Sequence, residues 1–182
     1  LAVDFLSIAG HKCYGPKGIG ALYIKNNRVI EPLIHGGGHE NGRRSGTESV
    51  PLIVGLGAAC TLSASANSES MKVLRDRLHV TLDDRVKGGV VLNGHDTERL
   101  PNTLNVSFPG KDASDILSKL KGLAVSTGSS CHTNDREMSP VLKAMGVTPR
   151  IGFGSVRISL GLTTTVEDID QAAELLVRAL GA

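Results

Sequence analysis

Apolar and polar residues alternate along this 182-residue chain with two different periods, which predict strands interleaved with helices. Short apolar runs of strand length predict strands at 1–9, 19–24, 90–93, 103–108, 123–127 and 156–160. Apolar residues at helical spacing predict one long helix or two joined helices over 51–87, and shorter helices at 112–122, 139–146 and 166–180. Because the two kinds of element interleave without an internal repeat, the pattern indicates an α/β fold.

Capping residues support several of these helix boundaries. Pro51 suits the first turn of the long helical segment, and Ser139 can cap a short helix that starts at Pro140. Thr165 can cap the last helix, and Asp168 adds negative charge to its first turn. Gly88 and Gly89 are expected to stop the long helical segment, and Gly122 is expected to end the helix at 112–122.

The strand predicted at 156–160 separates two kinds of side chain. Val156, Ile158 and Leu160 share one face, so Arg157 and Ser159 point away from that apolar face. A guanidinium offers a planar fork that matches a carboxylate. Arg157 is therefore a candidate anchor for an acidic group, and the alternative is an ordinary exposed strand arginine.

Composition and charge narrow the class of protein. The 20 basic and 18 acidic residues are spread along the chain, without the basic stripe that tracks nucleic acid. No apolar run approaches the ~20 residues that span a bilayer, so we expect no membrane partner. Three widely spaced cysteines do not suggest a disulfide framework, which favours a reducing compartment, the cytoplasm or an organelle matrix.

Cys131 stands in the polar run "VSTGSSCHTND", where no apolar neighbour would cover it. A thiolate that acts as a nucleophile needs such an accessible, polar setting, and His132 is near enough to help deprotonate it. The alternative is an incidental loop thiol. Cys60 lies in an apolar helical segment and is expected in the core, while Cys13 has no required role. These cysteines and histidines lack the regular spacing of a metal site, so no metal is expected.

Lys12 stands in the loop "GHKCYGPKG", between a predicted strand and a Gly/Pro turn. The glycines at 10, 15, 18 and 20, with Pro16, predict a tight backbone that holds a neighbouring side chain in place. A lysine held beside a cofactor suits Schiff-base chemistry, whereas a solvated loop lysine is the alternative. A second Gly-rich segment, 34–49, is too rich in glycine and charge for a regular element.

Five segments together resemble the cysteine desulfurases and selenocysteine lyases of the class V aminotransferase group, which depend on pyridoxal 5'-phosphate. The matches follow the order of that family at about its spacing: "GHKCYGPKGIGALYI", "GGGHENGRRSGTES", "RLPNTLNVSF", "SSCHTN" with "SPVLKAMG", and "SVRISLGLTTTVEDID". Five ordered matches are far more specific than one glycine-rich loop. The form "IAGHKCYGP" and the "CH" pair favour the selenocysteine-lyase-like branch.

The resemblance implies roles for individual residues. Lys12 would be the Schiff-base lysine and, once released, a base, while His11 would contact the cofactor phosphate. Thr47 would reach the phosphate bound in the other subunit, which implies a homodimer. Arg157 would bind the substrate α-carboxylate, and Cys131 would attack the substrate sulfur as a thiolate. The implied reaction removes sulfur or selenium from L-cysteine or L-selenocysteine, gives alanine, and supplies an acceptor protein, as in iron–sulfur cluster assembly.

The same resemblance implies the PLP-dependent transferase fold (fold type I). Residues 1–65 would be the C-terminal part of the large PLP-binding domain, and 66–182 the complete small domain with the cysteine loop. The family residues that precede the lysine segment are not in the sequence, so we expect weak cofactor binding and negligible turnover from this chain alone. The alternative is a truncated, non-catalytic homologue that acts as a binding or regulatory partner, or accepts a persulfide on Cys131. Sulfur and selenium are not distinguished at this stage.

Overall fold

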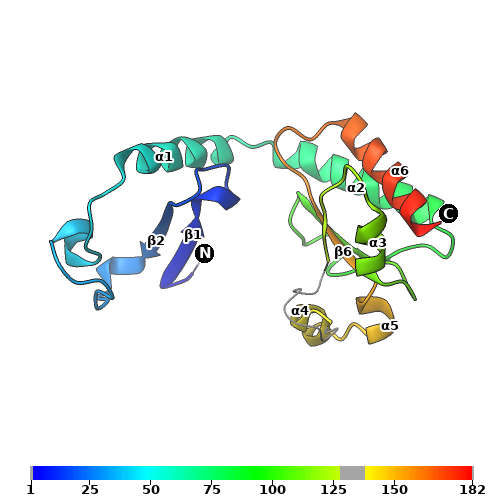
Figure 1. Ribbon diagram of the computed structural model, residues 1–182, viewed down its shortest axis with the longest axis horizontal. Coiled ribbons are helices and arrows are strands. Elements are labelled where there is room, and N and C mark those ends of the chain that lie inside the picture. Colours follow the sequence, from blue (N-terminus) through cyan, green and yellow to red (C-terminus); the bar gives the residue numbers. More distant parts are fainter. Residues whose placement is uncertain (1, 128–137, 182) are drawn as a thin grey trace. The chain divides into compact units, whose positions relative to one another are not determined.

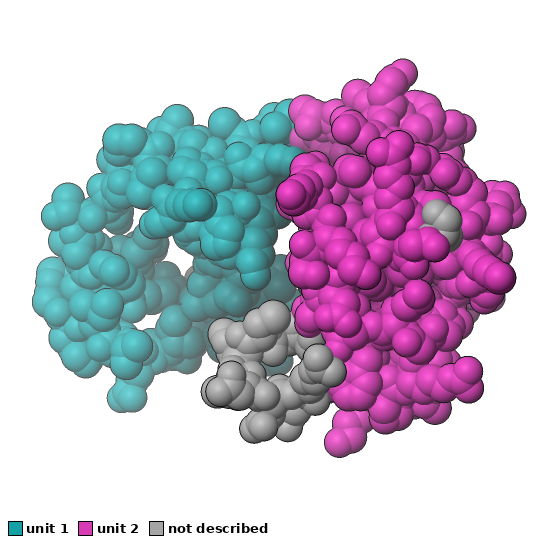
Figure 2. Space-filling model, turned by 45° about the vertical axis from the view of Figure 1, so that its right-hand side comes forward, with its two compact units in different colours: residues 1–66 teal, residues 67–182 magenta. Residues whose placement is uncertain are grey.

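The structure, a computed structural model, describes residues 2–127 and 138–181 (Figure 1). The chain divides into two compact units, residues 1–66 and 67–182, which are coloured separately in Figure 2. Each unit has its own sheet, and each is described by itself below.

Unit 1 consists of an antiparallel hairpin, connecting turns and one helix. Strands β1 (Phe5–Ala9) and β2 (Gly20–Ile24) pair along their full length, with Phe5 opposite Ile24 and Ala9 opposite Gly20. Helix α1 covers Val50–Ala64 and has Pro51 in its first turn, as the sequence predicts. Short 3₁₀ turns connect these elements at Gly10–Lys12, Lys25–Asn27 and His39–Gly42.

Unit 1 leaves most of its apolar side chains exposed. Among its described residues only Gly10 and Ala59 are buried. Exposed apolar side chains lie on both strands and on α1: Phe5, Leu6, Ile8, Leu22, Tyr23, Ile53, Val54 and Leu62. A two-stranded hairpin is marginally stable in water unless another layer packs on it. The expectation that Cys60 lies in a core is wrong for this unit, because α1 buries only Ala59 and leaves Cys60 exposed.

Unit 2 contains a four-stranded antiparallel sheet covered on one face by three helices (Figure 1). The strand order is β3-β4-β6-β5, from strands Val91–Leu92, Thr103–Ser107, Ser155–Ser159 and Ser126–Thr127. The covering helices are α2 (Ser68–Arg85), α3 (Ala113–Lys119) and α6 (Val166–Leu180). Their apolar side chains and the inward residues of β4 and β6 form one hydrophobic core. Two short helices, α4 (Pro140–Ala144) and α5 (Pro149–Gly152), precede β6.

Helix α6 begins with a capping box. The Thr165 hydroxyl accepts a hydrogen bond from the Asp168 amide, and the Asp168 carboxylate accepts one from the Thr165 amide. Arg77 and Arg85 of α2 pair with Asp170 and Glu174 of α6 at 2.8 and 2.7 Å, on the exposed side of the helix pair. Exposed pairs of this kind add little stability, so the buried apolar face of α6 is its main attachment.

The predicted elements are present, with differences at their ends. The long helical segment is two helices that end before the predicted stop at Gly88, and α3 ends at Lys119 rather than at Gly122. Strand β5 is shorter than predicted, and α5 was not predicted because four residues are too few to show helical spacing. No single helix in the described part of the chain is long and apolar enough to cross a membrane.

A buried arginine of α2 forms a hydrogen bond with the segment before β4. Arg75 is only 2% exposed and donates to the Asp76 carboxylate and, at 2.7 Å, to the Leu100 carbonyl. Arg99 donates to the same Asp76 oxygen at 3.1 Å.

His79 of α2 has a lowered pKa. Partial burial, and secondarily the charge of Arg99, lower the pKa of His79 below its usual value.

The lowered His79 pKa predicts a pH-dependent stability of unit 2. The folded chain binds a proton at His79 less readily than the unfolded chain, so the free energy of unfolding falls as pH decreases through about 6.5. Replacing His79 with Gln should flatten the stability profile between about pH 7.5 and about pH 5.5. Urea unfolding at each pH measures this. His35→Gln, at an exposed position, is the control that should leave the profile unchanged, and an unchanged slope in the His79 variant would contradict the prediction.

The contrast between the units predicts unequal hydrogen exchange. Amides of β1 and β2 should exchange about a hundredfold faster than those of β4 and β6 in a dilute sample, because unit 1 has few buried apolar contacts. Exchange followed by NMR or mass spectrometry tests this, with α6 as the protected reference. Protection of β1 equal to that of β6 would show that unit 1 is covered by another layer.

Candidate functional site

The loop that carries Lys12 is held by backbone hydrogen bonds at its base. The Gly10 amide donates to Ile19 O at 2.9 Å, and the Cys13 and Gly15 amides both donate to Gly10 O, at 3.0 and 2.9 Å. The loop therefore closes on Gly10, directly where β1 ends. Lys12 is the last residue of the 3₁₀ turn that begins at this glycine.

The glycines of the loop are required by close backbone approaches. A Cβ at Gly10 would lie 2.8 Å from Ile19 O, and one at Gly20 would lie 2.5 Å from Ile8 O. Both distances are too short for any side chain, so these positions admit only glycine without a shift of the backbone. These close approaches are the physical reason for the tight loop that the sequence predicts.

Lys12 and His11 are both exposed at the tip of this turn. Within residues 2–127 and 138–181, neither side chain makes a hydrogen bond or an ion pair. The Lys12 amine is thus accessible while its backbone is constrained. A free amine on a constrained loop is the arrangement that a carbonyl-binding lysine needs.

Cys13 has a local role that sequence reasoning missed. Its thiol lies 3.2 Å from Gly10 O, and its carbonyl accepts a hydrogen bond of 3.3 Å from the Ser63 hydroxyl of α1. The residue is half-buried and links the Lys12 loop to α1. No spacing signal in the sequence relates residues 13 and 63, so only the fold could reveal this contact.

The second Gly-rich segment is ordered by its own hydrogen bonds. The Ser45 hydroxyl donates to Gly37 O at 2.6 Å, and the Ser45 amide donates to Ile34 O at 3.2 Å. Arg44 donates to Ser45 O at 2.6 Å, which closes the next turn. Thr47 follows this turn and is exposed, so its hydroxyl is accessible to a ligand or another chain.

Arg157 lies on the face of the unit 2 sheet opposite the hydrophobic core. Strand β6 buries Val156 and Ile158 and exposes Arg157 and Ser159, as the alternation predicts. The Arg157 guanidinium has no hydrogen bond or ion pair with any residue that the structure describes. An exposed planar cation without a described partner is available to a carboxylate.

Next to Arg157, this face carries a polar network, defined here as Asn93, Asn105, Ser107 and Ser155. The Asn93 amide nitrogen donates to Asn105 Oδ1 and to the Ser107 hydroxyl, both at 2.8 Å. The Ser155 hydroxyl donates to the same Asn105 oxygen at 2.8 Å. Sequence reasoning did not single out these residues, although the polar positions of "TLNVSF" alternate with period two and point to one face.

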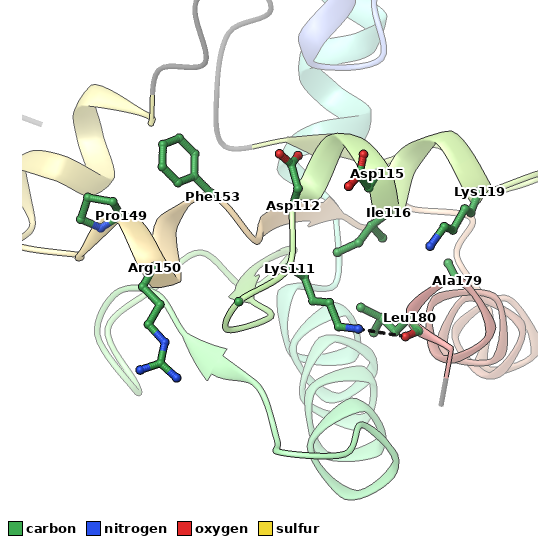
Figure 3. A pocket seen from close by; sticks show the side chains of 11 residues that line it. Lys111, Asp112, Asp115, Ile116, Lys119, Pro149, Arg150, Phe153, Ala179 and Leu180 are labelled. Atoms are coloured by element: carbon green, nitrogen blue, oxygen red, sulfur yellow. Dashed lines mark hydrogen bonds between the residues drawn. The ribbon is translucent and has the colours of Figure 1, made fainter.

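A separate pocket of about 420 Å³ lies between α3, α5 and the end of α6 (Figure 3). Lys111, Asp112 and Arg150 are among its lining residues, and Lys111 donates to Leu180 O at 3.3 Å. None of the site residues predicted from the sequence lines this pocket. Cys131 and His132 lie outside the described residues, so the role predicted for the thiol stays a prediction.

Comparison with known proteins gives a consistent picture. The Aminotransferase class-V family profile matches residues 1–172. The chain is 44% identical over 186 residues to a cysteine desulfurase IscS of Pectobacterium atrosepticum, covering 100% of this chain and 46% of that protein. It is 45% identical to a cysteine desulfurase IscS of Methanosarcina thermophila, covering 97% and 44% of the two chains.

Two solved structures are also similar. A NifS-like protein superposes with a TM-score of 0.85 at 39% identity, covering 99% of this chain and 47% of its own. A NifS-like protein from Rickettsia africae gives 0.86 at 35% identity, with 99% and 48% coverage. The chain thus spans about half the length of the relatives that it matches.

The architecture and the comparisons agree with the resemblance seen in the five sequence segments. The mixed α/β organisation is that of fold type I, and cysteine desulfurases and class V aminotransferases depend on pyridoxal phosphate. The chain belongs to the class V aminotransferase family of pyridoxal-phosphate-dependent enzymes, among relatives named cysteine desulfurases.

Proposed function

We propose that this chain carries the cofactor-lysine loop and the substrate-binding small domain of a cysteine desulfurase. The observation that supports this most directly is the match of residues 1–172 to the class V aminotransferase family, within which the exposed side chains of Lys12 and Arg157 are accessible to ligands. Residues 1–66 would then be the end of the large cofactor domain, and residues 67–182 the small domain. The active form would be a homodimer, with Thr47 reaching the cofactor phosphate of the other subunit.

The side chains of unit 1 fit pyridoxal phosphate by their chemistry. Lys12 supplies the amine that an aldehyde needs, and the exposed imidazole of His11 and hydroxyl of Thr47 can hydrogen-bond a phosphate. When bound, the cofactor supplies an electron sink for charge that develops at the substrate α-carbon. The closed base of the loop at Gly10 would keep the Lys12 backbone in one position and so limit the space that its amine can reach.

The residues of this chain would share the reaction as follows. Arg157 binds the α-carboxylate of cysteine and orients the amino acid. Lys12, once its amine is released, accepts the α-proton as a base. The Cys131 thiolate attacks the substrate sulfur, so an S–S bond forms while the substrate C–S bond breaks. Protonation of the remaining three-carbon fragment gives alanine, and the persulfide on Cys131 passes to an acceptor protein.

Within this function we favour sulfur over selenium as the element that is removed from the substrate. The relatives described above are named cysteine desulfurases, whereas "IAGHKCYGP" and the "CH" pair favour the selenocysteine-lyase-like branch by resemblance alone. A cysteine at position 131 suits attack on a substrate sulfur directly.

The cofactor assignment predicts a covalent label at one lysine. After incubation with pyridoxal phosphate and reduction with borohydride, the pyridoxyl group should be found on Lys12 by peptide mass spectrometry, because this exposed amine stands on the loop closed at Gly10 and matches the lysine segment of the family. Lys12→Ala should lose about tenfold or more of the label. Lys17→Ala is the matched control, since Lys17 is an exposed lysine of the same loop.

Two outcomes would count against this assignment. Equal labelling of the wild-type chain and the Lys12 variant would remove Lys12 from the site. Labelling spread evenly over the exposed lysines would show that the cofactor does not react preferentially with Lys12.

A further inference from the structure

We propose that Asn105 is a second substrate-binding residue, which donates a hydrogen bond to the carboxylate that Arg157 binds. The proposal rests on the proposed function, because it takes Arg157 as the carboxylate anchor. It adds a neutral donor on the adjacent strand, and it makes Asn93 and Ser155 positioning residues that hold the Asn105 amide.

The sheet register places Asn105 directly beside Arg157. The two residues are opposite one another in the antiparallel pair β4–β6. The Asn105 carbonyl accepts its backbone hydrogen bond from the Asn93 amide of the neighbouring segment, at 2.9 Å. Because the amide and carbonyl of one strand residue point to the same side, Asn105 exchanges no backbone hydrogen bond with Arg157. Pairs of this kind have Cα atoms about 4.5 Å apart and the closest side chains in the ladder.

The polar network fixes the direction of the Asn105 amide. Its Oδ1 accepts two hydrogen bonds of 2.8 Å, from Asn93 and from Ser155. Asn93 and Ser155 are buried, at 9% and 0% exposure, so these donors are themselves held in place. With its oxygen engaged on one side, the amide must present its NH₂ group on the other side.

The Asn105 NH₂ group is free to bind a ligand. It donates to no residue that the structure describes. Asn105 is half-buried, and its nitrogen is not among the buried unpaired side-chain nitrogens of the described part of the chain, which belong to Arg99. Two donors without described partners, one charged and one neutral, therefore lie on neighbouring strands at the face of the sheet opposite the core.

This arrangement suits a carboxylate better than a single arginine does. One carboxylate oxygen can accept a hydrogen bond from the Arg157 guanidinium and the other can accept one from the Asn105 amide. Side chains from two strands then fix the orientation of the carboxylate. A neutral amide adds this constraint without a second buried charge. Ser126, the other cross-strand neighbour of Arg157, belongs to the opposite kind of pair, in which the side chains are farther apart.

The test uses the whole 182-residue chain, labelled with ¹⁵N, and L-alanine as the probe. Alanine carries the carboxylate and amine of the proposed substrate, and alaninamide, which lacks the carboxylate, is the ligand control. We expect alanine, and not alaninamide, to shift both the Arg157 Nε–H signal and the Asn105 side-chain NH₂ signals. Two variants assign these signals. The Arg157 Nε–H signal is the one that disappears in Arg157→Lys, and the Asn105 NH₂ signals are those that disappear in Asn105→Ala.

Two variants measure the contribution of the amide. Asn105→Ala should weaken alanine binding about tenfold or more, the effect of one hydrogen bond to a charged acceptor. Ser126→Ala should change it less than about twofold, because the wide pair keeps its hydroxyl away from the guanidinium. The backbone amide spectrum of each variant shows whether that variant folds. If Asn105→Ala does not fold, the signal shifts of the wild-type chain decide whether Asn105 binds the carboxylate.

The outcomes separate this inference from the proposed function. Shifts at Arg157 with stationary Asn105 signals, or unchanged affinity in a folded Asn105→Ala variant, would overturn the role of Asn105 and leave the carboxylate anchor in place. An Arg157 signal that does not respond to alanine would overturn the anchor itself, and with it the pairing.

Discussion

The antiparallel register between β4 and β6 is the constraint on which unit 2 depends. With Val106 opposite Val156, one face of the pair presents apolar side chains to α2, α3 and α6. The same alternation brings Asn105 and Arg157 together on the other face. A slip of one residue would exchange the two faces, exposing the core residues and burying the guanidinium. Core formation and the geometry of the candidate carboxylate site are therefore two consequences of one pairing.

The two units divide the proposed chemistry and differ in how they are stabilised. Unit 2 has a continuous core, so the residues on the open face of its sheet are supported by packing from behind. Unit 1 holds Lys12 by glycine-dependent backbone contacts around Gly10 and by the link from Cys13 to Ser63. Its exposed hairpin gives little hydrophobic stabilisation. The precision of the Lys12 loop thus comes from local hydrogen bonding, whereas that of Arg157 comes from tertiary packing.

Much of the fold and part of the candidate site were predictable because they are encoded locally. Alternation placed Arg157 on the polar face, and the glycines around Lys12 indicated a constrained loop, which the close approaches at Gly10 confirm. Cys60 was assigned to a core wrongly, because an apolar helix shows that a residue can be buried but not whether another layer covers it. The predicted nucleophile, Cys131, stays a prediction.

The element types, the capping of α6 and the family can be predicted from the amino-acid order alone, since they depend on residues close together or on ordered motifs. Which polar residues meet follows from the folded arrangement of the strands. Asn93, Asn105 and Ser155 come from three different strands or strand ends, and their hydrogen bonds depend on strand order and register. No local pattern specifies strand order, because pairing joins residues distant along the chain and its energy comes from burial of the whole face.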